Sequence, residues 1–455
     1  MLSDVIGPLR VLYLVHALPP CEFSGSPLIA HAYAKRAADR GWKTTVVSAD
    51  PSVAGWGDVV DVREPGEWFH RVAVPPTRFG TWGLLAASDK RDPKSEATRF
   101  FVETLRRTRA DLVHVVDNMH LPLDWLDLAK EAGIPVVRTV ISTEDLCALG
   151  PPVSPASGPA GYCAAPLTPE QCASCLTAKY GNDFAWPDEV GIAGASPKGK
   201  DWLLERLKVK RAEAERRFGS VFERVIFSNA AWRHYFEEAL PLDPDRVRLI
   251  ETGADLTVWC HPAARIAKGP GEPLVFTLAG SPDPAGGHLD AVRAFSRPEL
   301  VDRDDWRLRF LGPVDPAMLA PLLASNPRVE IIGPYQPKDL PAHLATADVG
   351  LSTSLFATSD RVTREYLLAG LPVVANPTFG NRDLVVDGRN GIMYDRGQPD
   401  GLARAVCGVL DDRALLERLT AAAAAARPMI RSVDDEMAEI VSLYGEVVKA
   451  RRRSR

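Results

Sequence analysis

The chain has 455 residues, of which 46% are hydrophobic and 25% are charged, and its formal net charge is −5 at pH 7. This length exceeds that of one ordinary core and predicts two substantial domains. The slightly acidic balance provides no general basic field for nucleic acid, which is therefore not an expected partner. The sequence shows neither a run of about 18 uncharged apolar residues nor a signal-peptide pattern, so a cytoplasmic location is expected.

The first half of the chain alternates apolar strand patterns with helical patterns. Buried β-branched strands separated by helices are typical of a parallel sheet that is covered on both faces. The order of strand, loop, helix and strand at the start predicts a Rossmann-like lobe. Strands are predicted at 10–18, 43–50, 110–118 and 133–142, helices at 28–41 and 124–133, and a basic amphipathic stretch at 202–222.

The second half repeats this alternation after a linker at 261–273 that is rich in Pro, Gly and Ala. The predicted fold class is therefore α/β, with two Rossmann-like doubly wound domains that face a central cleft. The expected domains are 1–255, 256–430, and a C-terminal helix and basic tail at 431–455 that is considered to pack back on the first domain. Strands are predicted at 273–281, 306–312, 328–335, 348–354 and 371–376, and helices at 288–295, 318–325, 339–347 and 364–370.

Three segments together resemble one known family. They are DRVRLIETGAD at 245–255, RVEIIGPYQPKDLPAHLATADVGLSTS at 328–354, and EYLLAGLPVVANPTFGNRDLVVDGRNGIMYD at 365–395. Their order and spacing resemble the GT-B retaining glycosyltransferases of family 4, also called glycosyl transferases group 1, over nearly the whole chain. The resemblance implies a hexosyltransferase-like enzyme that moves a sugar from a nucleotide-sugar donor to a glycan, lipid-linked, natural-product or protein acceptor, without a catalytic divalent cation. It also implies an acceptor-side first domain and a donor-side second domain.

A nucleotide-sugar donor needs its pyrophosphate held near a helix N-terminus, with backbone N–H groups and cations that offset its charge. The loop at 358–362 precedes a helix and is expected to supply this terminus. In the resembling enzymes, the Glu that matches Glu365 accepts hydrogen bonds from both ribose hydroxyls; the alternative is an exposed helix charge. The candidate donor-binding residues are Gly25, Ser26, Gly280, Ser281, Tyr335, Thr358, Ser359, Arg361, Arg364, Glu365 and Arg382.

Two further residues are candidates for catalysis. His120 follows a predicted strand and is expected to face the sugar, with Asp117 and Asn118 as polar neighbours; a surface histidine is the alternative. Asp360 either orients the sugar or caps the helix that Arg361 opens, and capping is favoured. In the first lobe, FSGSP at 23–27 is expected to form an anion-binding backbone loop around Gly25 and Ser26.

The sequence departs from the family pattern at several donor positions. Ala357 stands where a second Glu is usual, and Ser281 and Gly286 stand where an Arg and a Lys normally clamp the pyrophosphate. Ile141 and Ser142 replace a His-Asp pair of the first lobe. Charge-assisted contacts are worth roughly 1.5 to 3 kcal/mol each, so other groups must replace them. Two alternatives to ordinary transfer therefore stay open: a catalytically silent GT-B protein that binds a ligand or partner, and a GT-B enzyme with an unusual donor.

Arg361, Arg364 and Arg382 are the cations expected to replace the missing clamp, because arginine binds phosphate well in a bidentate manner. Surface salt bridges are the alternative for each of them.

A cysteine-rich insertion occupies residues 147–175. Four thiolates in a chain without a signal peptide predict a structural zinc site, with reduced thiols, an iron–sulfur centre or disulfides as alternatives. The expected metal ligands are Cys147, Cys163, Cys172 and Cys175.

The chain ends in the basic segment KARRRSR at 449–455. A solvated helix end is favoured over contact with anionic lipid or phosphate, so membrane contact is not expected.

Overall fold

The structure is a computed structural model, and it describes residues 7–19, 21–22, 25–56, 60–62, 69–76, 94–148, 163, 165–180, 200–259, 271–280, 286–314, 319, 327–398 and 400–453. The chain divides into two compact units. Unit 1 contains the described residues up to Glu251 and the C-terminal segment from Asp434, and unit 2 runs from Thr252 to Val433. Among the described residues, no helix combines the length and the apolar character needed to cross a bilayer.

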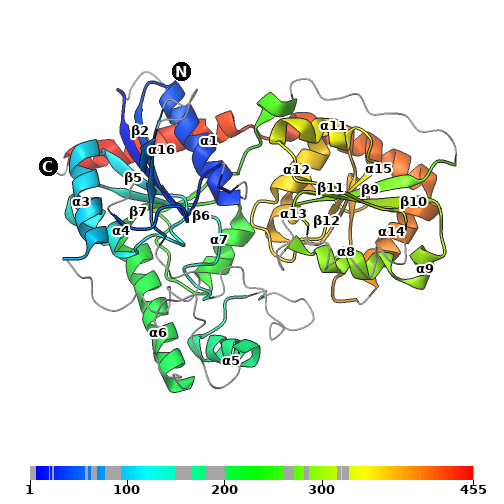
Figure 1. The fold of residues 1–455 in the computed structure, drawn as a ribbon, viewed down its shortest axis with the longest axis horizontal. Coiled ribbons are helices and arrows are strands. Elements are labelled where there is room, and N and C mark those ends of the chain that lie inside the picture. The colour runs from blue at the N-terminus through cyan, green and yellow to red at the C-terminus, as the bar shows by residue number, and fades with distance from the viewer. Residues whose placement is uncertain are drawn as a thin grey trace. The chain divides into compact units, whose positions relative to one another are not determined.

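Unit 1 is built on an eight-stranded sheet in the order β3-β4-β2-β1-β5-β6-β7-β8. Strands β2, β5, β6 and β7 of this sheet are labelled in Figure 1. All neighbouring strands are parallel except β3 and β4, which are antiparallel. The central strands are buried on both faces, which explains their near-continuous β-branched and apolar sequences. The strands are β1 (Arg10–Val15), β2 (Lys43–Ala49), β3 (Val60–Val62), β4 (His70–Val74), β5 (Leu112–Val115), β6 (Val136–Val140), β7 (Phe222–Phe227) and β8 (Val247–Leu249).

The helices of unit 1 include three that the sequence analysis did not predict, α3, α5 and α7. Ser95 caps α3 by accepting a hydrogen bond from the backbone N of Thr98, and Asn229 caps α7 in the same way. The helices are α1 (Gly25–Asp39), α3 (Glu96–Thr108), α4 (Asp124–Glu131), α5 (Pro169–Tyr180), α6 (Lys200–Arg216), α7 (Ala230–Glu237) and α16 (Val433–Arg453), and a π-helical turn follows α6 at Arg217–Val221.

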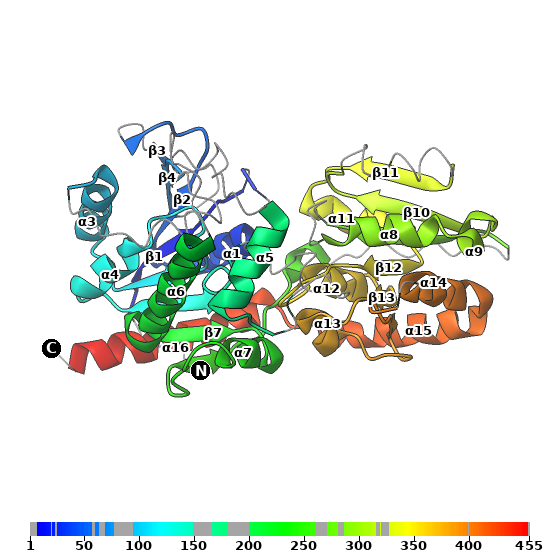
Figure 2. The ribbon, with the colours of Figure 1, turned by 90° about the horizontal axis from the view of Figure 1, so that it is seen from below.

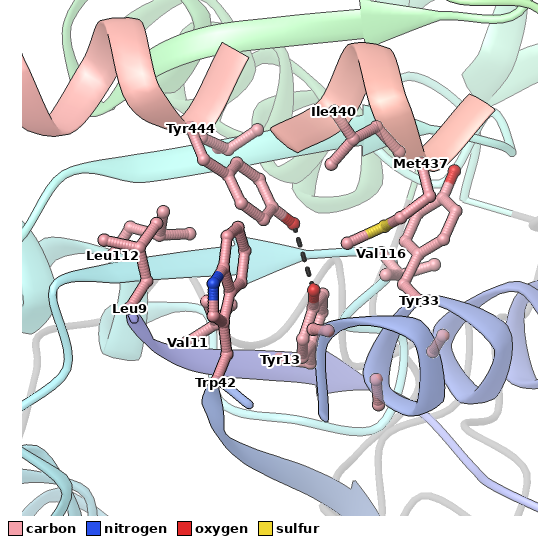
Figure 3. Packing of buried hydrophobic residues seen from close by; sticks show 14 of the residues in the cluster. Leu9, Val11, Tyr13, Tyr33, Trp42, Leu112, Val116, Met437, Ile440 and Tyr444 are labelled. Carbon is pink, nitrogen blue, oxygen red and sulfur yellow. Dashed lines mark hydrogen bonds between the residues drawn. The ribbon is translucent and has the colours of Figure 1, made fainter. Parts of the chain in front are cut away.

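Helix α16 packs against the sheet of unit 1 although it is the last element of the chain (Figure 3). Met437, Ile440 and Tyr444 are fully buried in a cluster with residues of β1, β5 and α1. The Tyr444 hydroxyl lies 3.3 Å from the hydroxyl of Tyr13 and also bonds to the buried His114 ring. The C-terminal helix is therefore part of the core of the N-terminal unit.

Unit 2 contains a six-stranded, fully parallel sheet in the order β11-β10-β9-β12-β13-β14. Figure 2 shows β11, β10, β12 and β13 in this sequence across the unit. The predicted helix at 318–325 lies outside the described residues except for Leu319. The strands are β9 (Leu274–Ala279), β10 (Trp306–Leu311), β11 (Val329–Gly333), β12 (Val349–Ser352), β13 (Val373–Ala375) and β14 (Gly391–Met393).

Helices cover the sheet of unit 2, and their apolar residues fill two buried clusters with those of the strands. The helices are α8 (His288–Phe295), α9 (Pro298–Val301), α11 (Leu340–Leu344), α12 (Arg361–Leu368), α13 (Phe379–Leu384), α14 (Gly401–Asp411) and α15 (Arg413–Ala426). Short 3₁₀ turns lie at Leu256–Trp259, Pro337–Asp339 and Arg427–Met429.

Both sheets have a point where the strand order reverses. In unit 1 this point lies between β1 and β5, and in unit 2 it lies between β9 and β12. Ligands of doubly wound folds bind at the carboxyl ends of the strands next to such a reversal. The topology therefore directs attention to the residues that follow these four strands.

Candidate functional sites in the two units

In unit 2, Asp360 forms the turn between β12 and α12. It has φ 33° and ψ 77°, and its carboxylate accepts hydrogen bonds from the Thr363 backbone N at 3.2 Å and the Ser352 hydroxyl at 2.9 Å. Burial raises the pKa of Asp360 despite these bonds. The capping role favoured from the sequence is confirmed, and both carboxylate oxygens are engaged within the protein.

The turn is held by a buried hydrogen-bond network from α13. Asn381 accepts from the Thr363 hydroxyl at 2.6 Å and donates to the Ser352 hydroxyl at 2.9 Å. Gly380 lies so close that a Cβ built on it would be 2.5 Å from the Asp360 backbone N. The start of α12 is therefore a fixed, preformed helix N-terminus.

Glu365 lies on α12 next to Arg361 and Tyr335. Its side chain is only 10% exposed, and it accepts a hydrogen bond from Arg361 Nε at 2.8 Å. The charge of Glu365 is the main cause of the raised pKa of Arg361. Burial, together with the charge of Glu365, raises the pKa of Tyr335 to about 12. Three predicted donor-binding residues thus form one cluster, and Glu365 is not the exposed helix charge of the alternative interpretation.

The remaining candidate donor-binding residues of unit 2 differ in their exposure to solvent. Arg364 and Thr358 are buried, Ser359 is half-buried, and Arg382 is exposed on α13. Gly280 follows β9 with φ 138°, in the region that favours glycine. Ser281 lies outside the described residues.

In unit 1, His16 and Asp117 follow β1 and β5, the two strands at the reversal point. His16 Nδ1 lies 2.6 Å from Asp117 Oδ2, and its Nε2 lies 3.1 Å from Glu22 Oε2. Burial alone would lower the pKa of His16, but Asp117 and Glu22 overcome this and raise it to about 11. Burial opposes the charge of Asp117, yet His16 holds its pKa below the ordinary value. The two residues therefore form a buried ion pair.

His120 and Ser26 adjoin this ion pair. The His120 ring centroid lies 5.8 Å from that of His16, and a hydrogen bond from Ser26 contributes to the lowered pKa of Asp117. Burial, followed by the charge of His16, lowers the pKa of His120. Helix α1 begins at Gly25, so Gly25 and Ser26 form its first turn instead of part of a loop, and Ser24, which precedes them in the predicted anion-binding segment, lies outside the described residues.

The sequence analysis did not select His16 as a site residue. The signal was available, because His16 ends an apolar strand pattern as Asp117 does, at the strand where the order reverses. The pairing itself required the structure, because the two residues are far apart in sequence.

A second buried ionic cluster follows β6. Arg138 is fully buried, donates to Glu144, to Asp145 at 3.1 Å and to the Val116 carbonyl, and these carboxylates keep its pKa raised against the effect of burial. Lys210 donates to the Glu144 carbonyl, and burial lowers its pKa to about 8. This cluster fixes the segment that follows Ile141 and Ser142.

The predicted zinc site is not supported. Cys147, Cys163, Cys172 and Cys175 form no disulfide, and the last two lie on α5. Burial, followed by the charge of Cys147, raises the pKa of Cys172 to about 12. Within the described ranges, no group of three or more His, Cys, Asp or Glu side chains is arranged to hold a metal ion.

Solved structures with the same architecture cover nearly the whole chain. The Anabaena protein HepE, in complex with UDP and glucose, matches with a TM-score of 0.59 at 16% identity over 96% of this chain and 99% of its own. Sucrose-phosphate synthase from Thermosynechococcus elongatus matches with a TM-score of 0.63 at 15% identity over 97% and 99%. The two parallel α/β units therefore define a protein with the GT-B fold.

Family models identify the protein family within this fold. Residues 24–253 match the model described as glycosyl transferase 4-like domain, and residues 273–412 match glycosyl transferases group 1. The first model alone covers half of the chain, so the chain belongs to the glycosyl transferase 4-like family.

Curated relatives match over shorter regions. D-inositol 3-phosphate glycosyltransferase from Corynebacterium efficiens is 29% identical over 37% of this chain and 44% of its own length. The enzyme of the same name from Nocardia farcinica is 30% identical over 46% and 50%. The chain thus spans half the length or less of these two relatives.

Proposed function

We propose that this protein transfers a glycosyl group from a nucleotide-sugar donor to an acceptor hydroxyl, with retention at the anomeric carbon. The observation that carries the proposal is the preformed start of α12, where Asp360 caps the helix and Glu365 lies beside Arg361 and Tyr335. A helix N-terminus favours negative charge and offers unpaired backbone N–H groups to a phosphate. Family membership supports the same chemistry.

On this proposal, unit 2 binds the donor through α12 and the turn before it. Glu365 accepts hydrogen bonds from the ribose, and Tyr335 packs beside it. Arg361, whose side chain is 41% exposed, supplies positive charge that Ser281 and Gly286 do not. Stabilisation of the departing phosphate is the main requirement of a transfer without a covalent protein intermediate, so the Asp360 cap acts by fixing the helix N-terminus.

On the acceptor side, His120 is the residue of unit 1 that we assign to proton transfer. Its pKa is lowered by burial and by His16, so the imidazole is neutral at pH 7 and able to accept a proton. The ion pair of His16 and Asp117 is assigned a positioning role, because both partners are already bonded to each other.

The relatives suggest which substrates to test first. HepE was crystallised with UDP and glucose, so UDP-glucose is the first donor. The relatives named as D-inositol 3-phosphate glycosyltransferases make a phosphorylated polyol the first acceptor. Such donors are cytoplasmic metabolites, and we place the activity in that compartment.

The test is a thermal-shift screen with UDP-, GDP-, ADP- and TDP-sugars, followed by donor hydrolysis with the best ligand. A ligand that binds only the folded state raises apparent stability, by about 2.7 kcal/mol at 100 times its Kd. A selective shift with donor turnover is expected. A shift without turnover in the presence or absence of acceptor would instead favour the silent binding protein that the Ala357, Ser281 and Gly286 positions suggest. No shift with any of these donors would contradict the proposal.

A further inference from the structure

A concave groove opens at the amino ends of strands β1, β2 and β4 in unit 1. It has a volume of about 730 Å³, and Arg10, Lys43 and His70, the first residues of the three strands, line it. In a parallel sheet the amino ends lie on the edge opposite to the carboxyl ends, where His16 and Asp117 are found. The groove is therefore separate from the candidate site of unit 1.

The groove is strongly basic. Arg107 and Arg109 from the end of α3 add to Arg10, Lys43 and His70, and none of the described residues that line the groove is acidic. Walls of a single charge sign concentrate the electrostatic potential in a concave site. The arrangement therefore favours an anionic ligand.

An adjoining hollow of about 230 Å³ extends this basic surface. It shares Arg10 and Arg109 with the groove and adds Arg451 and Arg452 from the end of α16. Asp111 also lines the hollow, and it neutralises Arg10 through a salt bridge of 2.7 Å. The cations contributed by α3, β2 and α16 thus exceed the carboxylate charge.

One detail indicates a built site. Thr44, which lines the groove, is only 2% exposed, and the described residues offer its hydroxyl no hydrogen-bond partner. Buried polar groups are nearly always satisfied, so a ligand atom or water is expected there. Arg109, which also lines the groove, is the C-cap of α3 and has φ 50°, the left-handed conformation in which helices commonly end.

We propose that this groove binds a small anion with two or more phosphate groups. Its volume lies within the range of roughly 300 to 1,000 Å³ that is typical of small-molecule sites. Its concave shape encloses a compact polyphosphate, whereas a flat bilayer reaches only the rim. The Thr44 hydroxyl donates to a phosphate oxygen, and Lys43 and Arg109 supply charge.

The first test uses isothermal titration calorimetry with inorganic tripolyphosphate. The Arg109→Gly variant removes one cation and relieves the positive φ at the same time. It is expected to keep or raise the thermal stability of unit 1 while it weakens tripolyphosphate binding by about tenfold. The Thr44→Val variant, which keeps the side-chain shape, is expected to weaken binding by about three- to tenfold.

Matched controls separate this site from other sources of affinity. Arg404→Gln combined with Arg418→Gln removes two exposed cations of unit 2 and is expected to change the affinity by less than about twofold. Arg361→Gln tests the proposed donor site, which also attracts phosphate, and is expected to leave the tripolyphosphate binding that depends on Arg109 unchanged.

Several results would overturn the proposal. The first is that tripolyphosphate does not bind. The second is that Arg361→Gln abolishes tripolyphosphate binding while Arg109→Gly does not. The third is that the control pair weakens tripolyphosphate binding as much as Arg109→Gly does. Binding only to vesicles of phosphatidylcholine and phosphatidylglycerol would do the same, because it would assign the surface to a membrane. Failure of these tests leaves the donor screen unaffected, because that screen reports on unit 2.

Discussion

The two units share one topology but differ at the strand edge where ligands are expected. In unit 1, the residues after β1 and β5 form a buried ion pair, His16 with Asp117, beside His120. In unit 2, the loop after β12 is closed by hydrogen bonds among Ser352, Asp360 and Asn381 and ends in the capped N-terminus of α12, which begins at Arg361 and carries Glu365 one turn later. The edge of unit 1 is built around a buried ion pair, whereas the edge of unit 2 is built around a helix N-terminus.

This difference shows how a repeated fold serves two tasks. The doubly wound order fixes the place of each site, whereas the side chains decide its chemistry. Backbone N–H groups at a rigid helix start suit a phosphate, and a neutral imidazole next to a fixed ion pair suits proton transfer. The units also differ in what completes them, because α16 belongs only to the core of unit 1.

Deletion of residues 434–455 is expected to have the largest effect, and to act on unit 1. It removes six buried apolar side chains of the unit 1 core, each worth about 1.5 to 3 kcal/mol, so the total of about 9 to 18 kcal/mol matches or exceeds the stability of a typical domain. These side chains are Met437, Ile440, Leu443, Tyr444, Val447 and Val448. Calorimetry should show that the unfolding transition of unit 1 disappears while that of unit 2 persists.

The control for this deletion is a shorter truncation that removes only residues 451–455. The six buried apolar side chains that α16 contributes to the unit 1 core stay in place, so both transitions should persist. Loss of both transitions in the longer deletion would show that unit 2 also depends on α16.

Asp117→Asn is the next largest change, because it leaves the buried, charged His16 with only the partly exposed Glu22 as a counterion. Removing one member of a buried ion pair typically costs about 3 to 5 kcal/mol, and a loss of this size is expected in unit 1 at pH 7. Asp127→Asn is the control, since Asp127 pairs with the partly exposed Arg216 and should cost about 1 kcal/mol or less.

The same pair predicts a pH dependence. The pKa of His16 is about 11 in the folded protein and near 6.5 when unfolded, so protonation stabilises the fold. This contribution is complete below pH 6.5 or so and is lost as the pH rises toward 11. Wild-type unit 1 should lose stability between roughly pH 7 and 10, and His16→Gln should remove most of this slope. The free energy of unfolding is measured by denaturant titration at several pH values. If it falls equally steeply with pH in the wild type and in His16→Gln, the ion pair is refuted.

Much of the architecture was predictable from the sequence because buried parallel strands leave long apolar runs. The strand at 10–18, the alternation after 273 and the helix near 364–370 all follow from such runs and have counterparts in β1, β9 to β13 and α12. Helix α3 was missed although its N-cap signal at Ser95 is present. Helix α5 was missed because it follows a segment rich in Pro and Gly, and such a composition predicts a loop.

The sites were less predictable, because their chemistry depends on long-range contacts. The Asp360 cap is local and was anticipated, whereas the pairing of His16 with Asp117 joins two distant strands. The cysteine spacing predicted zinc, but spacing along the chain does not report the three-dimensional arrangement, and the described residues contain no group of three or more metal-ligating side chains arranged to hold a metal ion. Features that depend on neighbouring residues in the sequence were therefore predictable, whereas interactions between charged groups from distant segments were not.

Gly380→Ala tests whether the start of α12 is held by close backbone packing. A Cβ at this position would meet the Asp360 backbone N at 2.5 Å and the Ser359 carbonyl carbon at 2.6 Å, so the turn must move. Overpacking of this kind costs about 1 to 3 kcal/mol, and donor affinity should fall as well. Gly408→Ala is a matched control on α14 with no atom within 4 Å of the added Cβ, and it should be neutral or stabilising by up to about 1 kcal/mol. Equal effects of the two substitutions would show that the turn tolerates movement.

Glu365→Gln is expected to have the smallest effect on the fold and a clear effect on the ligand. Arg361 loses an ion pair but remains 41% exposed, so water can solvate it and the thermal midpoint should barely change. Loss of the charged acceptor should weaken nucleotide binding by about 1 to 3 kcal/mol, measured by calorimetry with the donor identified in the screen. Glu417→Gln on the exposed surface of α15 is the control and should change neither quantity. If both variants bind the nucleotide as tightly as the wild type, Glu365 does not contact the ribose. Nucleotide binding at the start of α12 then depends on its backbone N–H groups and on arginine alone.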